Sequence, residues 1–219
     1  MIQKSAFSFL SQLKKNNNRV WFEKNKPVYL EAKENFDYFI TELIGAVSEF
    51  DPGIKGLEAK NCVYRIYRDI RFSKDKTPYK THFSAGLTGG GKNAYVPGYY
   101  LHVAPGKSLL AGGIWMPPSP QLNAIRQEID YNSKEFRKIL AAKNFKKYFG
   151  KLDEEYKLRT APKGYAKDHP EIELLKMKSY IVVHNMKDKN VLAQSAVKHF
   201  ADVFKAMKPL NSFLKRAMD

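Results

Sequence analysis

Apolar positions in the N-terminal quarter of the chain recur every three or four residues, which is the period of an amphipathic helix. The pattern predicts a first helix that ends at the asparagine run 16–18, a short helical piece around Trp21, and a long helix over residues 27–50. The sequence Asp-Pro-Gly at 51–53 ends the long helix, since proline and glycine both disfavour helical backbone.

Beyond residue 61 apolar and polar residues alternate, which indicates β-strands with one face toward a core. The strands that this pattern predicts span residues 62–72, 83–88, 98–104, 108–116 and 179–185. The glycine run 89–91 and the Pro105-Gly106 pair provide turns between neighbouring strands. Because parallel strands need long crossover connections, these short turns predict an antiparallel sheet.

The remaining segments return to helical spacing. Helices are expected from residue 119, within the lysine-rich stretch 134–151, at 170–177 and over 190–207, with an amphipathic extension beyond Pro209. No linker-like or repeated segment interrupts the pattern, so residues 1–219 are expected to form a single domain. The predicted fold class is α+β, a mostly antiparallel sheet flanked by N-terminal and C-terminal helices.

Composition places the chain among basic globular proteins. Its 219 residues include 38 lysines and arginines against 22 acidic residues, a formal net charge of +16, and 43% of them are hydrophobic. This hydrophobic content suits a folded core. No apolar run reaches the roughly 18–20 residues of a membrane span, and the amino terminus lacks a secretory leader. With Cys62 as its only cysteine, the protein is expected to be cytoplasmic, without membrane attachment, disulfides or a multi-cysteine metal site.

The positive charge favours an anionic partner such as nucleic acid, an acidic surface or a phosphorylated metabolite. It is concentrated in the stretch 134–151, whose basic residues are Lys134, Arg137, Lys138, Lys143, Lys146, Lys147 and Lys151. The aromatic residues of this stretch are expected to pack inward. A helix face that is simply solvated by its lysines explains the stretch equally well, so nucleic-acid binding is an alternative here.

A second concentration of charge, RDIRFSKDKTPYKTHF, occupies residues 68–83. Alternation places Arg68 with Tyr64 and Ile66 on the apolar face of the predicted strand. A charge on that face needs a partner, because an unpaired buried charge is costly. We therefore expect a structural ion pair for Arg68.

The loop after this strand is a candidate anion site. The basic residues placed to bind phosphate or carboxylate oxygens are Arg71, Lys74, Lys76 and Lys80. Pro78 stiffens the loop, and Tyr79 is expected to pack on the ligand. An ordinary lysine-rich surface turn is the alternative interpretation.

The strands that follow add imidazole and aromatic groups. If they pair, one sheet face gathers His82, Tyr100 and His102, with Trp115 as a wall beyond the glycine pair 112–113. Such a surface suits a planar or phosphorylated small molecule. The two histidines are candidates for proton transfer, and structural hydrogen bonding is the alternative.

The sequence PKGYAKDHP at 162–170 is the third candidate segment. Asp168 or His169 precedes Pro170, the expected first residue of a helix, so either side chain can cap that helix. A helix N-terminus with Lys163 nearby also forms an anion-binding corner. In that interpretation, Asp168 and His169 are candidate catalytic groups.

Several common chemistries leave no signature in the sequence. It contains no P-loop, dinucleotide-binding glycine fingerprint, HExxH motif or nucleophile elbow. The glycine run 89–91 precedes Lys92, but the rest of a phosphate-binding loop is missing. The motifs therefore identify no cofactor and no reaction class.

Four stretches together match a known family. They are FLxxLxxNNxRxWF at 9–22, RDIRFSKDKTPYKTHF at 68–83, GYYLHVAPGKSLLAGGIWMP at 98–117 and PKGYAKDHPEIELLKMKSY at 162–180. The chain resembles, over nearly its whole length, the family catalogued as domain of unknown function 2461. The resemblance implies a full-length domain, and it implies no activity, cofactor or catalytic residue.

The leading hypothesis is a soluble protein that binds a phosphorylated or otherwise anionic small molecule in a basic and aromatic pocket. Tyr79, Tyr100 and Trp115 would pack on the ligand, and the charged groups named above would bind its anionic oxygens. Two alternatives belong to other classes. One is nucleic-acid binding by the basic surface, and the other is docking of a protein partner on the charged loop.

Overall fold

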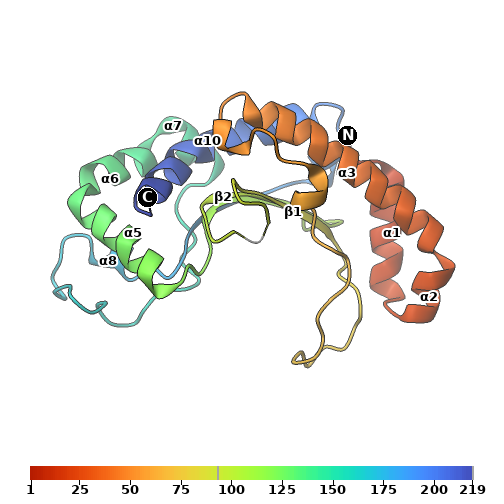
Figure 1. Cartoon of the computed structure of the whole chain (residues 1–219), viewed down its shortest axis with the longest axis horizontal. Coiled ribbons are helices and arrows are strands. Elements are labelled where there is room, and N and C mark those ends of the chain that lie inside the picture. The colour runs from red at the N-terminus through yellow and green to blue at the C-terminus, as the bar shows by residue number, and fades with distance from the viewer. Residues whose placement is uncertain (93, 219) are drawn as a thin grey trace.

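The computed structural model describes residues 1–92 and 94–218 and centres on an antiparallel sheet. Its strands are β1 (Phe83–Leu87), β2 (Gly98–Val103), β3 (Leu109–Ile114) and β4 (Tyr180–Asn185), which lie side by side in that order. Figure 1 shows this sheet beneath a layer of helices. The predicted α+β class is confirmed, and each strand lies inside a segment that the sequence predicted.

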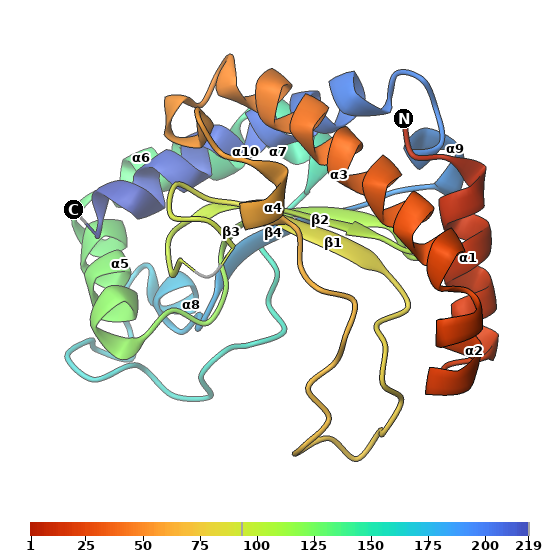
Figure 2. The same cartoon turned by 45° about the vertical axis from the view of Figure 1, so that its right-hand side comes forward.

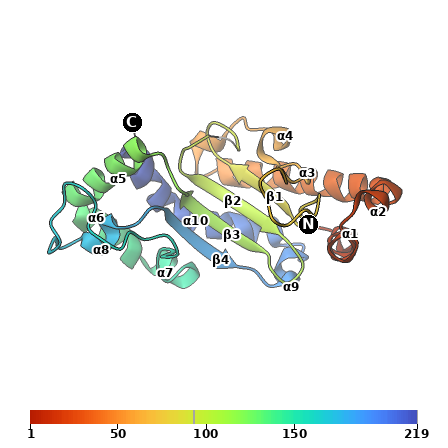
Figure 3. The ribbon, with the colours of Figure 1, turned by 90° about the horizontal axis from the view of Figure 1, so that it is seen from below.

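Helices cover one face of the sheet and both of its ends. They are α1 (Lys4–Lys15), α2 (Arg19–Lys24), α3 (Lys26–Ser48), α4 (Ala59–Cys62), α5 (Ser119–Tyr131), α6 (Ser133–Ala141), α7 (Lys143–Tyr148), α8 (Ile172–Leu175), α9 (Asp188–Val191) and α10 (Ala196–Arg216), with a 3-10 turn at Pro52–Ile54. The two longest helices, α3 and α10, cross the same face (Figures 1 and 2). Seen from the opposite side, the strands lie in front of α10 (Figure 3). None of the helices in the described part of the chain combines the length and apolar composition that crossing a bilayer requires.

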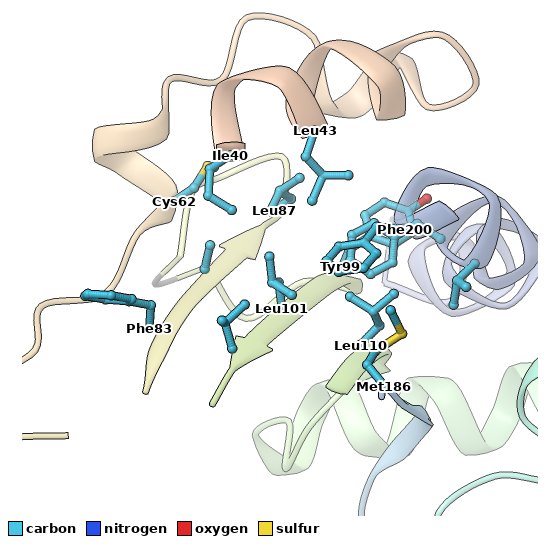
Figure 4. Close-up of a cluster of buried hydrophobic side chains, with 14 of the residues drawn as sticks. Ile40, Leu43, Cys62, Phe83, Leu87, Tyr99, Leu101, Leu110, Met186 and Phe200 are labelled. Carbon is cyan, nitrogen blue, oxygen red and sulfur yellow. The ribbon is translucent and has the colours of Figure 1, made fainter. Parts of the chain in front are cut away.

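The hydrophobic core lies between the sheet and these two helices. The strand register places Ala85 opposite Leu101 and Leu101 opposite Leu110, and all three side chains are fully buried. Leu43 of α3 and Phe200 of α10 close over them (Figure 4). Burial of a large apolar side chain contributes about 1.5–3 kcal/mol. This layer therefore holds the helices to one side of the sheet.

A polar network fixes α10 to the sheet within this apolar layer. The Tyr99 hydroxyl donates to Oδ2 of Asp51 at 2.7 Å, and Nζ of Lys208 donates to Oδ1 at 2.9 Å. Burial opposes ionisation of Asp51, but the hydrogen bonds from Lys208 and Tyr99 outweigh it and lower the pKa of the carboxyl group. The carboxylate therefore joins the end of α3, strand β2 and helix α10.

Helix α10 continues through Pro209 without a break. The sequence predicted a helix over about 190–207 that continues past the proline, and the structure shows one helix over Ala196–Arg216. Pro209 lacks the N–H that would bond the carbonyl group of Lys205, and both residues are exposed to water. Met207 and Leu210, on either side of the proline, are fully buried. Packing on both sides outweighs the loss of one exposed helical hydrogen bond.

The predicted strand over 62–72 is wrong. Cys62 ends α4, and the following residues make only isolated bridges, between Val63 and Ala85 and between Tyr67 and Tyr79. The chain follows the edge of β1 for a few residues and then leaves it. Residues 66–80 form a projecting arm (Figure 2), whose two limbs bond to each other through Lys80 N–H to the Ile66 carbonyl at 2.8 Å. Alternation in the sequence came from this paired arm rather than from a strand of the sheet.

The single basic helix predicted within 134–151 is also divided. Ala142 has an extended backbone between α6 and α7. The break lets both short helices turn an aromatic ring into the core, since Phe136 of α6 and Phe145 of α7 are almost completely buried. The inward packing of these rings was expected from the sequence.

Gly113 in β3 occupies a position that no other residue can take without a shift in the backbone. Its φ is 108°, and a Cβ atom there would collide with the carbonyl oxygen of Tyr180 on β4. This close approach lets the ends of β3 and β4 stay paired next to the exposed Trp115.

We expect Gly113→Ala to destabilise the protein by at least about 3 kcal/mol, because it combines backbone strain with a collision. Gly45 is the matched control, since it is exposed within α3 and has no atom within 4 Å of its added Cβ. Gly45→Ala should stabilise the protein by about 0.5–1 kcal/mol. Urea unfolding of both variants checks these values, and equal effects at the two positions would contradict the assignment.

Candidate functional site

The open face of the sheet is hollowed into a cavity of about 750 Å³. The strand register sets the residues of its floor side by side in the order Gly86, Tyr100, Ala111 and Val183. Because Gly86 and Ala111 have little or no side chain, the floor leaves room above the strands. This is the face that Figure 3 presents to the viewer.

Aromatic rings stand around this floor. Tyr64 and Tyr100 lie with ring centroids 6.4 Å apart, and both line the cavity. Trp115, just after β3, and Tyr95, in the connection between β1 and β2, also line it and are about as exposed, at 62% and 63%. With aliphatic residues of β3 and β4 completing the lining, the cavity suits a flat and largely apolar group.

Tyr64 and Tyr95 are site residues that the sequence interpretation missed. Alternation had placed Tyr64 toward the core, but the structure buries its neighbour Val63 there, opposite Ala85, and turns Tyr64 to the open face. Its hydroxyl donates to the carbonyl oxygen of Lys92 at 2.8 Å. Tyr95 lies in a loop without periodicity. The glycine run 89–91 indicated a turn there, and no pattern in the sequence pointed to Tyr95 as a site residue.

Two lysines, Lys80 and Lys92, lie next to Tyr64, and the charge of Arg65 acts on Lys80; we call Arg65, Lys80 and Lys92 the basic corner. Nζ of Lys80 lies 5.4 Å from the Tyr64 ring centroid, while Nζ of Lys92 donates to the Val63 carbonyl at 2.6 Å. Neither lysine forms an ion pair with any residue that the structure describes. Burial, together with the charges of Arg65 and Lys92, lowers the pKa of Lys80. The basic corner therefore carries positive charge beside an apolar cavity.

His82 and His102 form a stacked pair at the other end of β1 and β2. Their ring centroids are 4.0 Å apart, and the Tyr100 hydroxyl lies 3.3 Å from Nδ1 of His102. Burial, together with the nearby His102 and Lys80, lowers the pKa of His82 from 6.5 to about 4. Burial also lowers the pKa of His102. Both imidazoles are therefore neutral at neutral pH and can accept a proton.

The structure places the arm residues Arg71, Lys74 and Lys76 away from the cavity lining. The Arg71 guanidinium pairs with Asp69 through Nε at 3.0 Å and Nη2 at 2.7 Å. Lys76 donates to the carbonyl oxygen of Ile70 at 3.0 Å, and Lys74 is exposed. These three cations lie on the arm, whereas Lys80 at its base belongs to the basic corner.

The expected ion pair of Arg68 is confirmed. Its Nη1 lies 2.6 Å from Oδ2 of Asp75, and the same nitrogen donates to the Thr77 carbonyl at 3.0 Å. Arg68 thus fastens the two limbs of the arm to each other.

Tyr79 packs into the base of the arm. It is buried, and its ring stacks on Phe22 of α2 at 3.9 Å between centroids. Asn17 bonds its backbone N–H and its carbonyl group. The structure therefore places this ring between the arm and α2, outside the cavity lining.

The segment with Lys163, Asp168 and His169 lies beside α5. Nε2 of His169 is 2.9 Å from Oδ1 of Asp130, and its Nδ1 accepts a hydrogen bond from the Glu171 N–H. Lys163 and Asp168 are exposed, and no residue of this segment lines the cavity. Of the candidates named from the sequence, the structure brings Lys80, His82, Tyr100, His102 and Trp115 to the open face of the sheet.

Within residues 1–92 and 94–218, no three His, Cys, Asp or Glu side chains gather in a way that could hold a metal ion.

Comparison with known proteins gives one match. The family model described as conserved hypothetical protein (DUF2461) matches residues 5–213. Neither the curated proteins nor the solved structures contain a match. The matched range includes every residue of the cavity and of the basic corner.

The His82 pair makes the stability of the fold depend on pH. An unfolded histidine binds a proton below a pH of about 6.5, whereas folded His82 binds one only near its lowered pKa of about 4. The unfolded state therefore binds more protons in this window, and stability is lost as the pH falls through it.

Between pH 7 and pH 5 we expect His82 to account for a loss of about 1–2 kcal/mol of folding free energy. His82→Phe keeps a ring stacked on His102 and removes the titration, so its stability should fall less over the same interval. Urea unfolding at both pH values measures the difference. An identical fall in wild type and variant would show that His82 titrates alike in the folded and unfolded states.

Proposed function

We propose that this chain, which belongs to the family of conserved hypothetical proteins DUF2461, binds a small molecule with a flat apolar body and an anionic group. The supporting observation is the cavity on the open face of the sheet, with aromatic walls and the basic corner at one side. Function is assigned from this site, because a fold alone does not specify a ligand.

The cavity favours a flat ligand body. Its volume of about 750 Å³ falls within the range of small-molecule sites. Trp115 and Tyr95 offer exposed ring faces, and Ala111 keeps the floor between them low. Aromatic faces at a shallow floor contact a planar group over its whole area, which a branched group cannot match.

The basic corner favours an anionic group on the same ligand. Lys92 lines the cavity, and two of its ammonium hydrogens are directed to backbone carbonyls of Lys60 and Val63. Its charge is not neutralised by a carboxylate in the described part of the chain. A carboxylate, sulfonate or phosphate beside Lys92 would gain a charge-assisted hydrogen bond.

The proposal does not assign anion binding to the arm. Arg71 is already bonded to Asp69, and Lys76 to a backbone carbonyl. We therefore assign anion recognition to Lys92, which lines the cavity, in place of the cradle that the sequence suggested.

Anilinonaphthalene sulfonate is a suitable probe, because it is flat, apolar and anionic and its fluorescence rises in an apolar site. We expect Ala111→Phe to fill the floor and weaken binding at least tenfold. Lys92→Gln should weaken it about fivefold, equivalent to roughly 1 kcal/mol, and Lys198→Gln on the exposed surface of α10 is the matched control. Circular dichroism verifies that each variant is folded.

The neutral analogue phenylnaphthylamine separates the two parts of the proposal. Its binding should fall with Ala111→Phe and stay unchanged with Lys92→Gln. If neither dye responds to Ala111→Phe, the cavity is not the binding site and the proposal fails.

A further inference from the structure

The surroundings of Lys80 in the basic corner differ from those of the other lysines named above. It is partly buried at the base of the arm, and its ammonium group lies 5.4 Å from the ring centroid of Tyr64, which lines the cavity. Arg65 and Lys92 place two positive charges in its surroundings, and His82 follows two residues later. Among the described residues, no carboxylate pairs with Lys80.

This environment favours the uncharged amine. A carboxylate would hold a proton on the nitrogen, whereas burial and two neighbouring cations disfavour the charged form. The lowered pKa of Lys80 agrees with this geometry. A lysine amine becomes a nucleophile under the same conditions, namely desolvation and a second cation close by.

Groups that can exchange protons lie next to this amine. The stacked imidazoles of His82 and His102 are both neutral at neutral pH, because burial lowers the pKa of each ring. The Tyr100 hydroxyl, 3.3 Å from Nδ1 of His102, extends this cluster to the cavity floor. After an amine has attacked a carbonyl carbon, a neutral imidazole can accept a proton from the nitrogen of the adduct, and a phenol hydroxyl can donate one to its oxygen.

We propose that Lys80 forms an imine with an aldehyde or ketone that carries a flat apolar body and an anionic group. The inference rests on the proposed function, since the cavity and Lys92 place the ligand. It names the substrate class of that site as carbonyl compounds and assigns Lys80 as the covalent residue.

The step balances without an oxidant or reductant. The amine nitrogen attacks the carbonyl carbon, a C–N bond forms, and the carbonyl oxygen takes a proton while the nitrogen loses one. A second proton then passes from the nitrogen to the hydroxyl oxygen, and departure of that oxygen as water breaks the C–O bond and leaves a C=N bond. Lysine and carbonyl compound therefore give imine and water, and we assign the proton transfers to the cluster of His82, His102 and Tyr100.

The surroundings of other lysines explain why the reaction would select Lys80. Lys92 donates to the carbonyl oxygens of Val63 and Lys60, which holds its nitrogen at the cavity lining and suits it to bind the anionic group. Lys76 on the arm likewise donates to a carbonyl oxygen. Lys198, by contrast, is exposed to water on the surface of α10.

Pyridoxal phosphate is the test probe, because it is a flat aldehyde with an anionic group. The full chain is incubated with the probe and reduced with borohydride, which turns an imine into a stable amine, and the modified lysines are located by peptide mass mapping. We expect about one equivalent on Lys80. Lys80→Arg should remove this label, Lys198→Arg should leave it unchanged, and pyridoxal without the phosphate should label Lys80 at least tenfold less.

The alternative results are distinct. Label spread evenly over exposed lysines, or unchanged labelling in Lys80→Arg, would overturn the imine proposal. Pyridoxine phosphate has the same shape and charge without the carbonyl group, so it tests the cavity alone by displacing anilinonaphthalene sulfonate. If it displaces the dye while Lys80 stays unlabelled, the imine proposal fails and the proposed function stands. If pyridoxine phosphate does not displace the dye and pyridoxal phosphate does not label Lys80, the imine proposal and the proposed function both fail.

Discussion

The packing of α3 and α10 against a single face of the sheet is the constraint on which the other features depend. Leu43 and Phe200 bury the residues that point toward these helices, so alternate residues on the same strands are left facing the other way. On that other face the strands present small residues such as Gly86 and Ala111. A sheet covered on both faces would have filled this space with side chains. The cavity is thus a consequence of one-sided cover and a low floor.

The cations near this cavity differ in whether a carboxylate pairs with them. On the arm, both arginines have carboxylate partners, since Arg68 pairs with Asp75 and Arg71 with Asp69. In the basic corner, Lys80 lies against a ring rather than a carboxylate. Net charge alone did not distinguish these two places, although they differ in what an incoming anion would meet. An anion gains more beside a cation without a partner than beside one already paired.

The local pattern of the sequence was enough to predict most secondary structure, because side-chain period reports which face of an element is buried. It failed where backbone pairing came from a partner the sequence could not specify. Alternation around Ile66 and Arg68 reflects pairing within the arm, and the predicted strand there does not exist. The terminal helix was expected from about residue 190, whereas the structure ends α9 at Val191 and begins α10 at Ala196.

The sequence by itself determined the α+β class, the neighbouring positions of β1, β2 and β3, and the sheet face shared by Tyr100 and His102, since each follows from short-range periodicity and short turns. The tertiary structure decided that β4, which is distant in the chain, pairs with β3. Only the tertiary structure decided that Tyr64 faces the cavity, that Lys80 separates from the other cations of its loop, and that the segment around His169 lies beside α5. These placements depend on how segments far apart in the chain meet. One residue of displacement along an edge turns a side chain to the opposite face, and no local pattern specifies that displacement.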